Sequence, residues 1–377
     1  MIETPSLVDQ YCHGVLRTEL GLGTFEAHLG RGMGPPAPGT TSFDTQTGFA
    51  VRRWCPPLLG LEPHCAPARY LARRRELGVL EAGRRLLRGS GITTYLMDTG
   101  LPDDLTGPAE MASAAEAETH EIVRLELLAE QVADTSGTVE SFLANLAESV
   151  HAAAVGAVAF TSVAGVRHGL ALAPQPPGPG EVRGAAGRWL AARTVGGPVT
   201  DPVLLRHLLW IAVASGRPLQ LHAGLGEPGL RIDRTDPVLL ADFARATTGL
   251  GTDLVLLHGY PYHRHAAHLA GIFPHVYADL GPALARTGAR AAAVLAEFLE
   301  LAPFGKLLFS SGASGLPELH VIGARLFREA LGRVLGGWVA DGAWSLHDAQ
   351  RVAGMIASGT ARRVYGLGTG EAAAADG

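Results

Sequence analysis

Two histidines directly follow short segments that read as buried strands. Residues 254–257 are all apolar and lead to His258, and residues 218–221 lead in the same way to His222. A glycine comes within two positions of each histidine, which is typical of a strand that ends there. In barrels of alternating strands and helices, catalytic side chains gather at the carboxyl ends of the strands. The two histidines therefore predict a functional site at the mouth of such a barrel.

The elements that must position these histidines alternate along the chain. Helical periodicity and N-capping residues predict helices between nearly all the expected strands. The expected strands lie at residues 6–12, 92–97, 120–125, 154–160, 218–222, 254–257, 276–278 and 306–310. This order favours a closed (β/α)8 TIM barrel. An open doubly wound sheet is the alternative, but it requires a phosphate-binding glycine turn after its first strand, and residues 11–15 do not supply one.

A single domain spanning residues 1–367 is the expected organisation. Residues 24–75 are expected to form an irregular insertion after the first strand, with a helix at residues 42–54. The periodicity of residues 69–88 predicts one helix with an arginine-rich exposed face. Extra helices and then a disordered tail are expected at the end of the chain, at residues 316–335, 345–358 and 368–377 respectively.

Composition suits a protein with a substantial buried core. The chain has 377 residues, of which 47% are hydrophobic and 18% charged. A formal net charge of -5 gives no reason to expect a nucleic acid or an anionic membrane as partner. Three cysteines cannot build a disulfide framework, and neither a signal peptide nor an apolar run of membrane-spanning length is evident. We expect a cytoplasmic protein that acts on a small molecule and can form a homo-oligomer.

Four motifs spread over the chain together resemble one family. They read Asp9-Gln-Tyr-Cys-His-Gly-Val, Leu219-Gln-Leu-His-Ala-Gly-Leu-Gly, Leu256-Leu-His-Gly-Tyr-Pro-Tyr-His-Arg and Lys306-Leu-Leu-Phe-Ser-Ser-Gly-Ala-Ser-Gly-Leu-Pro-Glu. From about residue 6 to 367 the chain resembles the amidohydrolase-related metal-dependent hydrolases, in particular the branch found ahead of a glutamine-synthetase-like domain in FluG and nodulin-type proteins. The resemblance implies a (β/α)8 barrel with one or two divalent metal ions that activate a water molecule for hydrolysis.

Site residues follow from the resemblance position by position. It assigns His13, His222 and His258 as metal ligands, a set that satisfies a three-ligand zinc site with an open fourth position. His258 is also the candidate for polarising a substrate carbonyl group. Cys12 is expected to face the helices as a small buried residue, and Asp98 to cap the segment after its strand.

Three positions depart from the family pattern. Tyr11 stands at the first histidine of a His-x-His pair, Gly312 at the aspartate that ends strand eight, and Thr161 where close relatives carry lysine. The missing aspartate is the group that takes a proton from the attacking water, so the departures weigh against ordinary amide hydrolysis. Glu227 and Glu318 are the nearest carboxylates in the sequence that could compensate.

Other polar residues are candidates for substrate binding. Arg167 matches an arginine of the family's strand-four loop and could hold a carboxylate in a bidentate fork, or form a structural ion pair. Arg124 and Glu126 lie two apart on an expected strand, so they share a face and could line the site or form a buried pair. His263 is a candidate as well, with an exposed helix position as its other interpretation.

Two classes of function follow. The first is an amidohydrolase-superfamily enzyme with an altered metal site, which hydrolyses a small amide or related C–N substrate with one divalent ion, zinc being the first choice. The family also contains non-hydrolytic decarboxylases, so carbon–carbon chemistry is a further alternative. The second class is a catalytically impaired barrel that acts as a binding or regulatory protein, a hypothesis motivated by Tyr11, Thr161 and Gly312.

Overall fold

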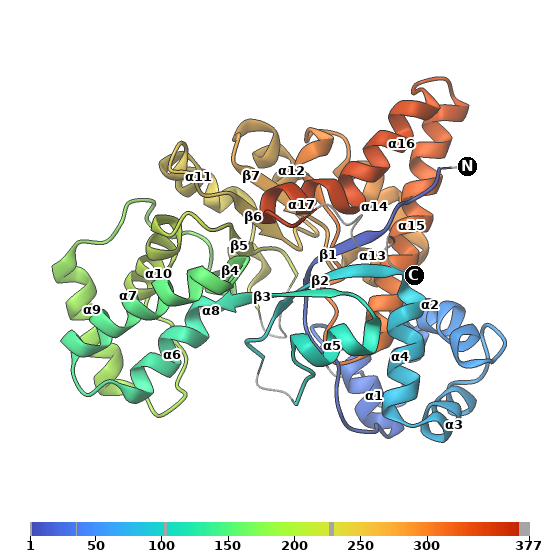
Figure 1. The fold of residues 1–377 in the computed structure, drawn as a ribbon, viewed down its shortest axis with the longest axis horizontal. Coiled ribbons are helices and arrows are strands. Elements are labelled where there is room, and N and C mark those ends of the chain that lie inside the picture. Colours follow the sequence, from blue (N-terminus) through green and yellow to red (C-terminus); the bar gives the residue numbers. More distant parts are fainter. Residues whose placement is uncertain (1, 35, 102–103, 226–229, 369–377) are drawn as a thin grey trace.

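Eight parallel strands form the centre of the protein in a computed structural model that describes residues 2–34, 36–101, 104–225 and 230–368. Each strand pairs with the next along the chain. The strands are β1 (Leu7–Cys12), β2 (Ile92–Asp98), β3 (Glu118–Arg124), β4 (Ala159–Ser162), β5 (Leu219–His222), β6 (Leu254–Leu257), β7 (Val276–Asp279) and β8 (Leu307–Leu308). The amide of Gln10 donates to the carbonyl of Phe309 (3.2 Å), so β1 also meets the segment after β8. The predicted (β/α)8 barrel is confirmed (Figure 1).

Helices connect the strands and surround the barrel (Figure 1). They are α1 (Leu22–Leu29), α2 (Gln46–Trp54), α3 (Pro67–Leu77), α4 (Val79–Ser90), α5 (Pro108–Ala115), α6 (Leu125–Thr135), α7 (Val139–Gly156), α8 (Ala164–Arg167), α9 (Pro179–Ala192), α10 (Pro202–Ala214), α11 (Ala241–Thr247), α12 (His263–Ile272), α13 (Ala283–Thr287), α14 (Ala291–Phe298), α15 (Pro317–Ala340), α16 (Leu346–Gly354) and α17 (Thr360–Tyr365). A π-helical segment, η7 (Met355–Gly359), joins the last two.

Several predicted boundaries differ from the structure. The strand predicted at 154–160 begins only at Ala159, because α7 continues through Gly156. The helix predicted at 69–88 is two helices, since Gly78 has a φ of 78°, a conformation that interrupts a right-handed helix and that glycine adopts readily. Helix α9 was not expected, because its proline- and glycine-rich start reads as a loop. The predicted tail begins at residue 368, and residues 369–377 lie outside the described part of the chain.

The segment predicted to be irregular, residues 24–75, consists largely of short helices. Helices α1, α2 and α3 lie here together with two 3-10 turns, η1 (Ser42–Asp44) and η2 (Pro56–Leu59). The segment packs on α4 and α15, as the grouping of these helices in Figure 1 shows, and its apolar side chains form a cluster of their own with the start of α15. The sequence did not predict these helices, because each is too short to show a clear helical period of apolar residues.

Helix α17 closes the end of the barrel away from the histidines. The hydroxyl of Tyr365 donates to Gln10 Oε1 (2.5 Å) and accepts from Gln220 Nε2 (2.8 Å), both inside the barrel. The guanidinium of Arg363 donates to the hydroxyl of Tyr277 (3.0 Å), early in β7. The opposite, carboxyl end of the strands is therefore the end that can admit a ligand.

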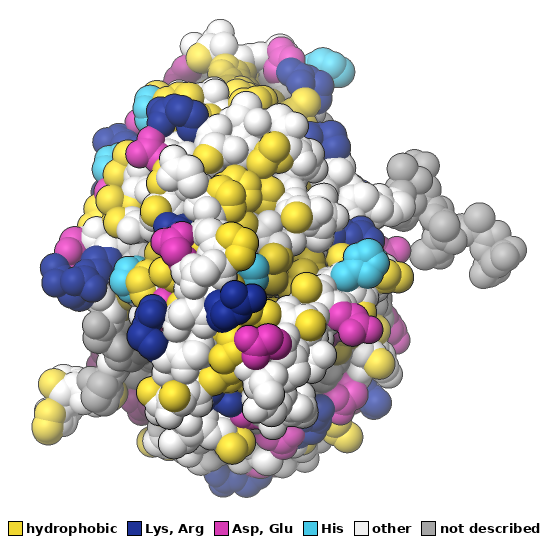
Figure 2. Space-filling view, turned by 90° about the vertical axis from the view of Figure 1, so that its left-hand side faces the viewer, with side chains coloured by type: hydrophobic (Ala, Val, Ile, Leu, Met, Phe, Trp, Pro, Cys, Tyr) yellow, Lys and Arg dark blue, Asp and Glu magenta, His cyan; other side chains and the backbone are white. Residues whose placement is uncertain are grey.

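The surface carries both signs of charge. Figure 2 shows one face, on which Lys and Arg side chains are interspersed with Asp and Glu rather than gathered in one field. Within the described residues, no helix is both long and apolar enough to cross a membrane.

Candidate active site

A cavity of about 470 Å³ opens at the carboxyl ends of the strands. Its wall includes Tyr11 and the three histidines predicted as ligands, His13, His222 and His258. His222 is the last residue of β5, while His13 and His258 directly follow β1 and β6. The common strand direction therefore brings residues from three distant parts of the chain to one mouth.

Tyr11 occupies the space among the histidines. Its ring meets those of His13, His222 and His258 edge-on, with centroids 5.3, 5.0 and 5.3 Å away. The residue is 1% exposed. The pairing of β1 with β2 shifts register between Asp9 and Cys12, the segment from which the Tyr11 ring points inward. The phenol ring thus stands between imidazoles that the sequence predicts to converge on an ion.

Asp98, at the end of β2, organises one side of the site. Its Oδ2 accepts hydrogen bonds from the hydroxyl of Tyr11 (2.8 Å) and from Arg124 Nη2 (2.6 Å) and Nε (3.1 Å). Its backbone carbonyl faces His13 Nδ1 at 2.7 Å, and because a carbonyl can only accept, Nδ1 carries the proton. The Arg124 guanidinium lowers the pKa of the Asp98 carboxyl despite its complete burial.

The imidazoles are uncharged at neutral pH. Burial, with a contribution from Arg286, lowers the pKa of His258 to about 3. Burial lowers the pKa of His13 to about 4, where the opposing effect of Asp98 is partly offset by Arg124 and Arg31. Burial also holds the pKa of His222 well below its usual value. Burial and the charge of Asp98 raise the pKa of Tyr11 well above the usual range, so it remains a phenol.

His258 has an unusual backbone. Its φ is 71°, and its amide donates to Asp279 Oδ1 (2.6 Å) in the neighbouring β7. A strained conformation of this kind persists only where its surroundings hold it. Gly281 provides the room for the ring, because a Cβ added there would lie 2.2 Å from His258 Nδ1.

Comparison with known proteins identifies the family. The amidohydrolase family model matches residues 98–367, which is more than half of the chain. The chain belongs to the amidohydrolase family. It is 35% identical over 155 residues to protein fluG of Emericella nidulans, an alignment that covers 40% of this chain and 18% of that protein. The chain therefore spans less than a fifth of the length of that relative.

Solved structures support the same fold. A protein from Lactobacillus casei ATCC 334, described as a putative metal-dependent hydrolase, superposes with a TM-score of 0.82 at 25% identity, over 96% of this chain and 95% of the other. The uronate isomerase of Thermotoga maritima gives a TM-score of 0.60 at 12% identity, over 96% and 94% of the two chains. At that identity the second likeness shows the fold alone.

The family implies a divalent metal, and the mouth offers only part of the donor set for one. His222 Nε2 and His258 Nδ1 are buried without a hydrogen-bond partner, as open ligand atoms would be. However, His258 Nδ1 lies against Gly281, and the Tyr11 ring contacts all three imidazoles. Among the described residues, one group of three possible ligand side chains has its donor atoms within 4.8 Å of one another. That group contains none of these histidines. A three-histidine ion does not fit this arrangement.

Each residue predicted to bind substrate now has a position. Arg124 and Arg167 line the cavity, and each also has an acidic partner, Asp98 at 2.6 Å for Arg124 and Glu130 at 3.4 Å for Arg167. Glu126 lies in α6 rather than on β3, and its Oε1 accepts from Ser162 (2.6 Å), so it does not share a face with Arg124 as predicted.

His263 and Glu318 do not join the site. His263 Nε2 lies 3.0 Å from Glu297 Oε2, and its side chain is not part of the cavity wall. Glu318 pairs with Arg74 at 3.0 Å beneath the insertion. Glu227 lies outside the described residues.

The sequence interpretation did not recognise several residues of the site. Asp98 was expected to cap the segment after its strand, and its Oδ1 does accept from the amide of Gly100 (2.8 Å). Its Oδ2 also accepts from Tyr11 and Arg124 beside the cavity, and the available signal was its position at a strand end, like that of His222. Arg31 and Arg286 line the cavity from the insertion and from α13. Neither has a motif around it, because both come from segments that only the folded chain brings over the barrel.

Proposed function

We propose that this member of the amidohydrolase family binds a small organic anion, of which a carboxylate is the simplest, in the mouth of its barrel. One observation carries the proposal. Among the described residues, the cavity wall holds four arginines and four histidines but no aspartate or glutamate: Arg31, Arg124, Arg167, Arg286, His13, His28, His222 and His258. Guanidinium groups recognise carboxylates through paired N–H donors.

The electrostatics of the site support the same ligand. Arg286 lowers the pKa of His258, and Arg31 and Arg124 lower that of His13. The nearby guanidinium groups therefore disfavour protonation of the imidazoles, because like charges repel. A negative ligand group is favoured there for the same reason.

The reaction we propose is hydrolysis of an amide or related C–N bond in a carboxylate-bearing substrate. A neutral imidazole can polarise a carbonyl oxygen as a hydrogen-bond donor, and His258 is assigned this role. No step is routed through a metal ion, because the three histidines do not fit one ion. The free, buried cysteines are consistent with the cytoplasmic location proposed from the sequence.

A binding or regulatory protein without catalysis is the second candidate. The observation that favours it is the placement of Tyr11 among the three imidazoles, where it fills space that a reacting group would need. Both candidates share the anion site and differ only in turnover.

Thermal unfolding and calorimetry with matched probes test the anion site. Succinate should stabilise the protein and succinamide, its neutral diamide, should not, with an effect that weakens as salt increases. Arg286→Gln should reduce succinate affinity about tenfold or more, as expected on losing a charged hydrogen-bond donor. Arg351→Gln, on the exposed face of α16, is the control and should leave affinity unchanged. Equal binding of succinate and succinamide would refute the proposal.

A further inference from the structure

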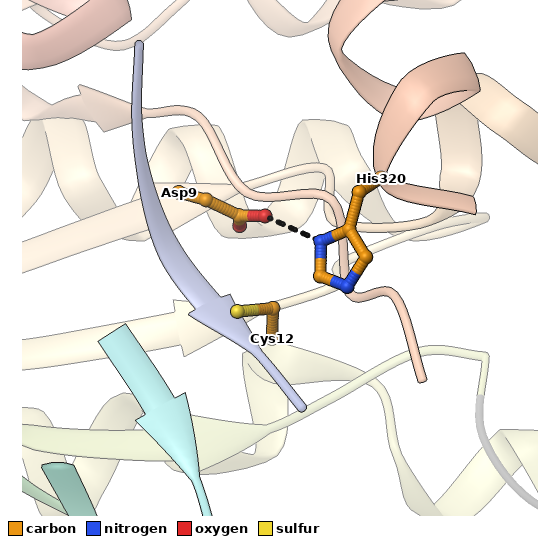
Figure 3. Close-up of side chains that lie close together, drawn as sticks. All are labelled: Asp9, Cys12 and His320. Atoms are coloured by element: carbon orange, nitrogen blue, oxygen red, sulfur yellow. Dashed lines mark ion pairs between the residues drawn. The ribbon is translucent and has the colours of Figure 1, made fainter. Parts of the chain in front are cut away.

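A second group of possible ligands lies outside the mouth, between β1 and α15. Figure 3 shows Asp9 and Cys12 on the first strand and His320 on the helix, with the imidazole of His320 facing the carboxylate of Asp9. One ligand atom from each lies within 4.8 Å of the others. All three residues are fully buried, at 0% exposure. None of them lines the mouth cavity.

His320 is the residue that needs an explanation. Neither of its ring nitrogens has a hydrogen-bond partner in the structure. Its Nδ1 is 3.6 Å from Asp9 Oδ2, which is too long for a hydrogen bond. Leaving a buried polar group unpaired costs roughly 1–3 kcal/mol, so native proteins seldom do so without an ion or another partner.

The surrounding contacts hold the group in place. The backbone amide and the hydroxyl of Ser311 donate to the two oxygens of Asp9, at 2.8 and 2.5 Å. The ring of Tyr95 packs edge-on against His320, with centroids 5.5 Å apart. Partners of this kind orient metal ligands in known sites.

We propose that Asp9, Cys12 and His320 bind one divalent ion of the zinc type. A carboxylate oxygen, a thiolate sulfur and an imidazole nitrogen are each established zinc ligands. On binding, the Cys12 thiol gives its proton to solvent, and the two negative ligands then balance the two charges of the ion. This neutrality matters because an uncompensated charge could not remain in a fully buried position.

The ion would stabilise the place where the barrel closes, between β1 and the segment that follows β8. The sheet runs from β1 to β8, and β8 contributes only two residues, Leu307 and Leu308, to its ladder. The ion would join β1 to the helix that follows β8, so it would tie the two ends of the sheet together. Its role is structural, because all three ligands are fully buried and none lines the mouth cavity, so a substrate could not reach the ion. Zinc usually has four ligands, so a water molecule would complete the set.

Metal analysis of variants tests the site. Protein purified from zinc-containing medium should carry about one equivalent of zinc, as for a structural site. Cys12→Ser and His320→Gln should each lose most of it. Two controls should retain it: Cys55→Ser, which changes another fully buried cysteine, and His222→Ala, which changes the mouth. Zinc that is lost in His222→Ala but kept in Cys12→Ser would overturn the proposal by placing the ion in the mouth.

Cobalt replacement in the wild-type protein provides a readout that does not depend on a variant folding. Co²⁺ should give a thiolate-to-metal charge-transfer absorption, and the same absorption in Cys55→Ser would exclude Cys55 as the sulfur ligand. Removing the ion with a chelator should lower the unfolding temperature, and zinc should restore it. Protein that takes up neither zinc nor cobalt would overturn the proposal.

Discussion

At the scale of single residues, Tyr11 and Gly312 replace the family's metal ligands and also change the packing around the mouth. The Tyr11 phenol donates to Asp98 Oδ2 at 2.8 Å and fills the space among three imidazoles. Gly312 has a φ of 58°, and a Cβ there would lie 2.5 Å from Pro282 Cδ. The backbone at this position has therefore adapted to the absence of a side chain.

Gly312→Asp should consequently fail to restore a metal ligand. We expect it to destabilise the protein by about 1–3 kcal/mol, because the new residue is held in a left-handed conformation against a proline ring. Denaturant unfolding measures the loss, and metal analysis should show no gain at the mouth. Gly312→Ala is the control: a similar loss assigns the effect to the backbone and Cβ. Wild-type stability in Gly312→Asp would contradict this account.

Gly281 makes a comparable prediction for His258. An alanine there would place its Cβ 2.2 Å from His258 Nδ1, so the imidazole must move. Gly281→Ala should reduce succinate binding by the contribution of one neutral hydrogen bond, roughly two- to tenfold. Calorimetry measures the affinity. Gly332→Ala in α15, where an added Cβ meets nothing within 4 Å, is the matched control and should bind normally.

At the scale of elements, one buried ion pair docks the insertion on the barrel. Arg74 of α3 and Glu318 of α15 are 3.0 Å apart and nearly inaccessible to solvent. The hydroxyl of Tyr70 also donates to Glu318 Oε1 (2.7 Å). Because Arg31 of the insertion lines the cavity, this docking indirectly shapes the mouth.

Glu318→Gln should destabilise the docking of the insertion. Removing one partner leaves a buried guanidinium without its counter-charge, which costs about 3–5 kcal/mol. Limited proteolysis should then cleave within residues 22–77 sooner than in the wild type. Glu329→Gln provides a comparison, since its pair with Arg53 of α2 is far more exposed and should matter little. Equal protease resistance of Glu318→Gln and the wild type would show that the pair doesn't hold the insertion.

At the scale of the whole molecule, Asp98 connects three strands. It accepts from Tyr11 of β1 and Arg124 of β3 while lying at the end of β2 itself. Arg124 lowers its pKa, so the folded state favours the ionised carboxylate. The stabilisation is present above the unfolded pKa of about 3.9 and is lost as the pH falls through the lower folded value.

Arg124→Met should reverse the pH dependence of the stability that Asp98 contributes. Without the guanidinium, burial raises the pKa of Asp98, so the variant should become more stable as the pH falls from about 7 to about 4, where the carboxyl is protonated. The deficit relative to the wild type, about 3–5 kcal/mol near neutral pH, should therefore shrink in acid. Denaturant unfolding at several pH values measures it. The Arg124→Met, Asp98→Asn double variant should lack the reversal; if it shows the same reversal, Asp98 is not responsible.

Much of the architecture could be predicted because it depends on local pattern. Apolar runs such as residues 254–257 mark strands, and the order of strands and helices leaves few folds besides the barrel. Predictions failed where local signals conflict: residues 154–156 are apolar enough for a strand but continue α7. The short helices of the insertion are stabilised by packing on α15 rather than by their own periodicity.

The sequence by itself determined which residues reach the mouth from the strand ends, because parallel strands of a barrel all present their carboxyl ends on one side. His13, His222 and His258 follow from that rule. Only the tertiary structure decided what they meet there. The Tyr11 ring among the imidazoles, the arginines brought over the cavity by distant segments, and the approach of His320 to Asp9 and Cys12 all depend on contacts between residues far apart in the chain, which no local pattern encodes.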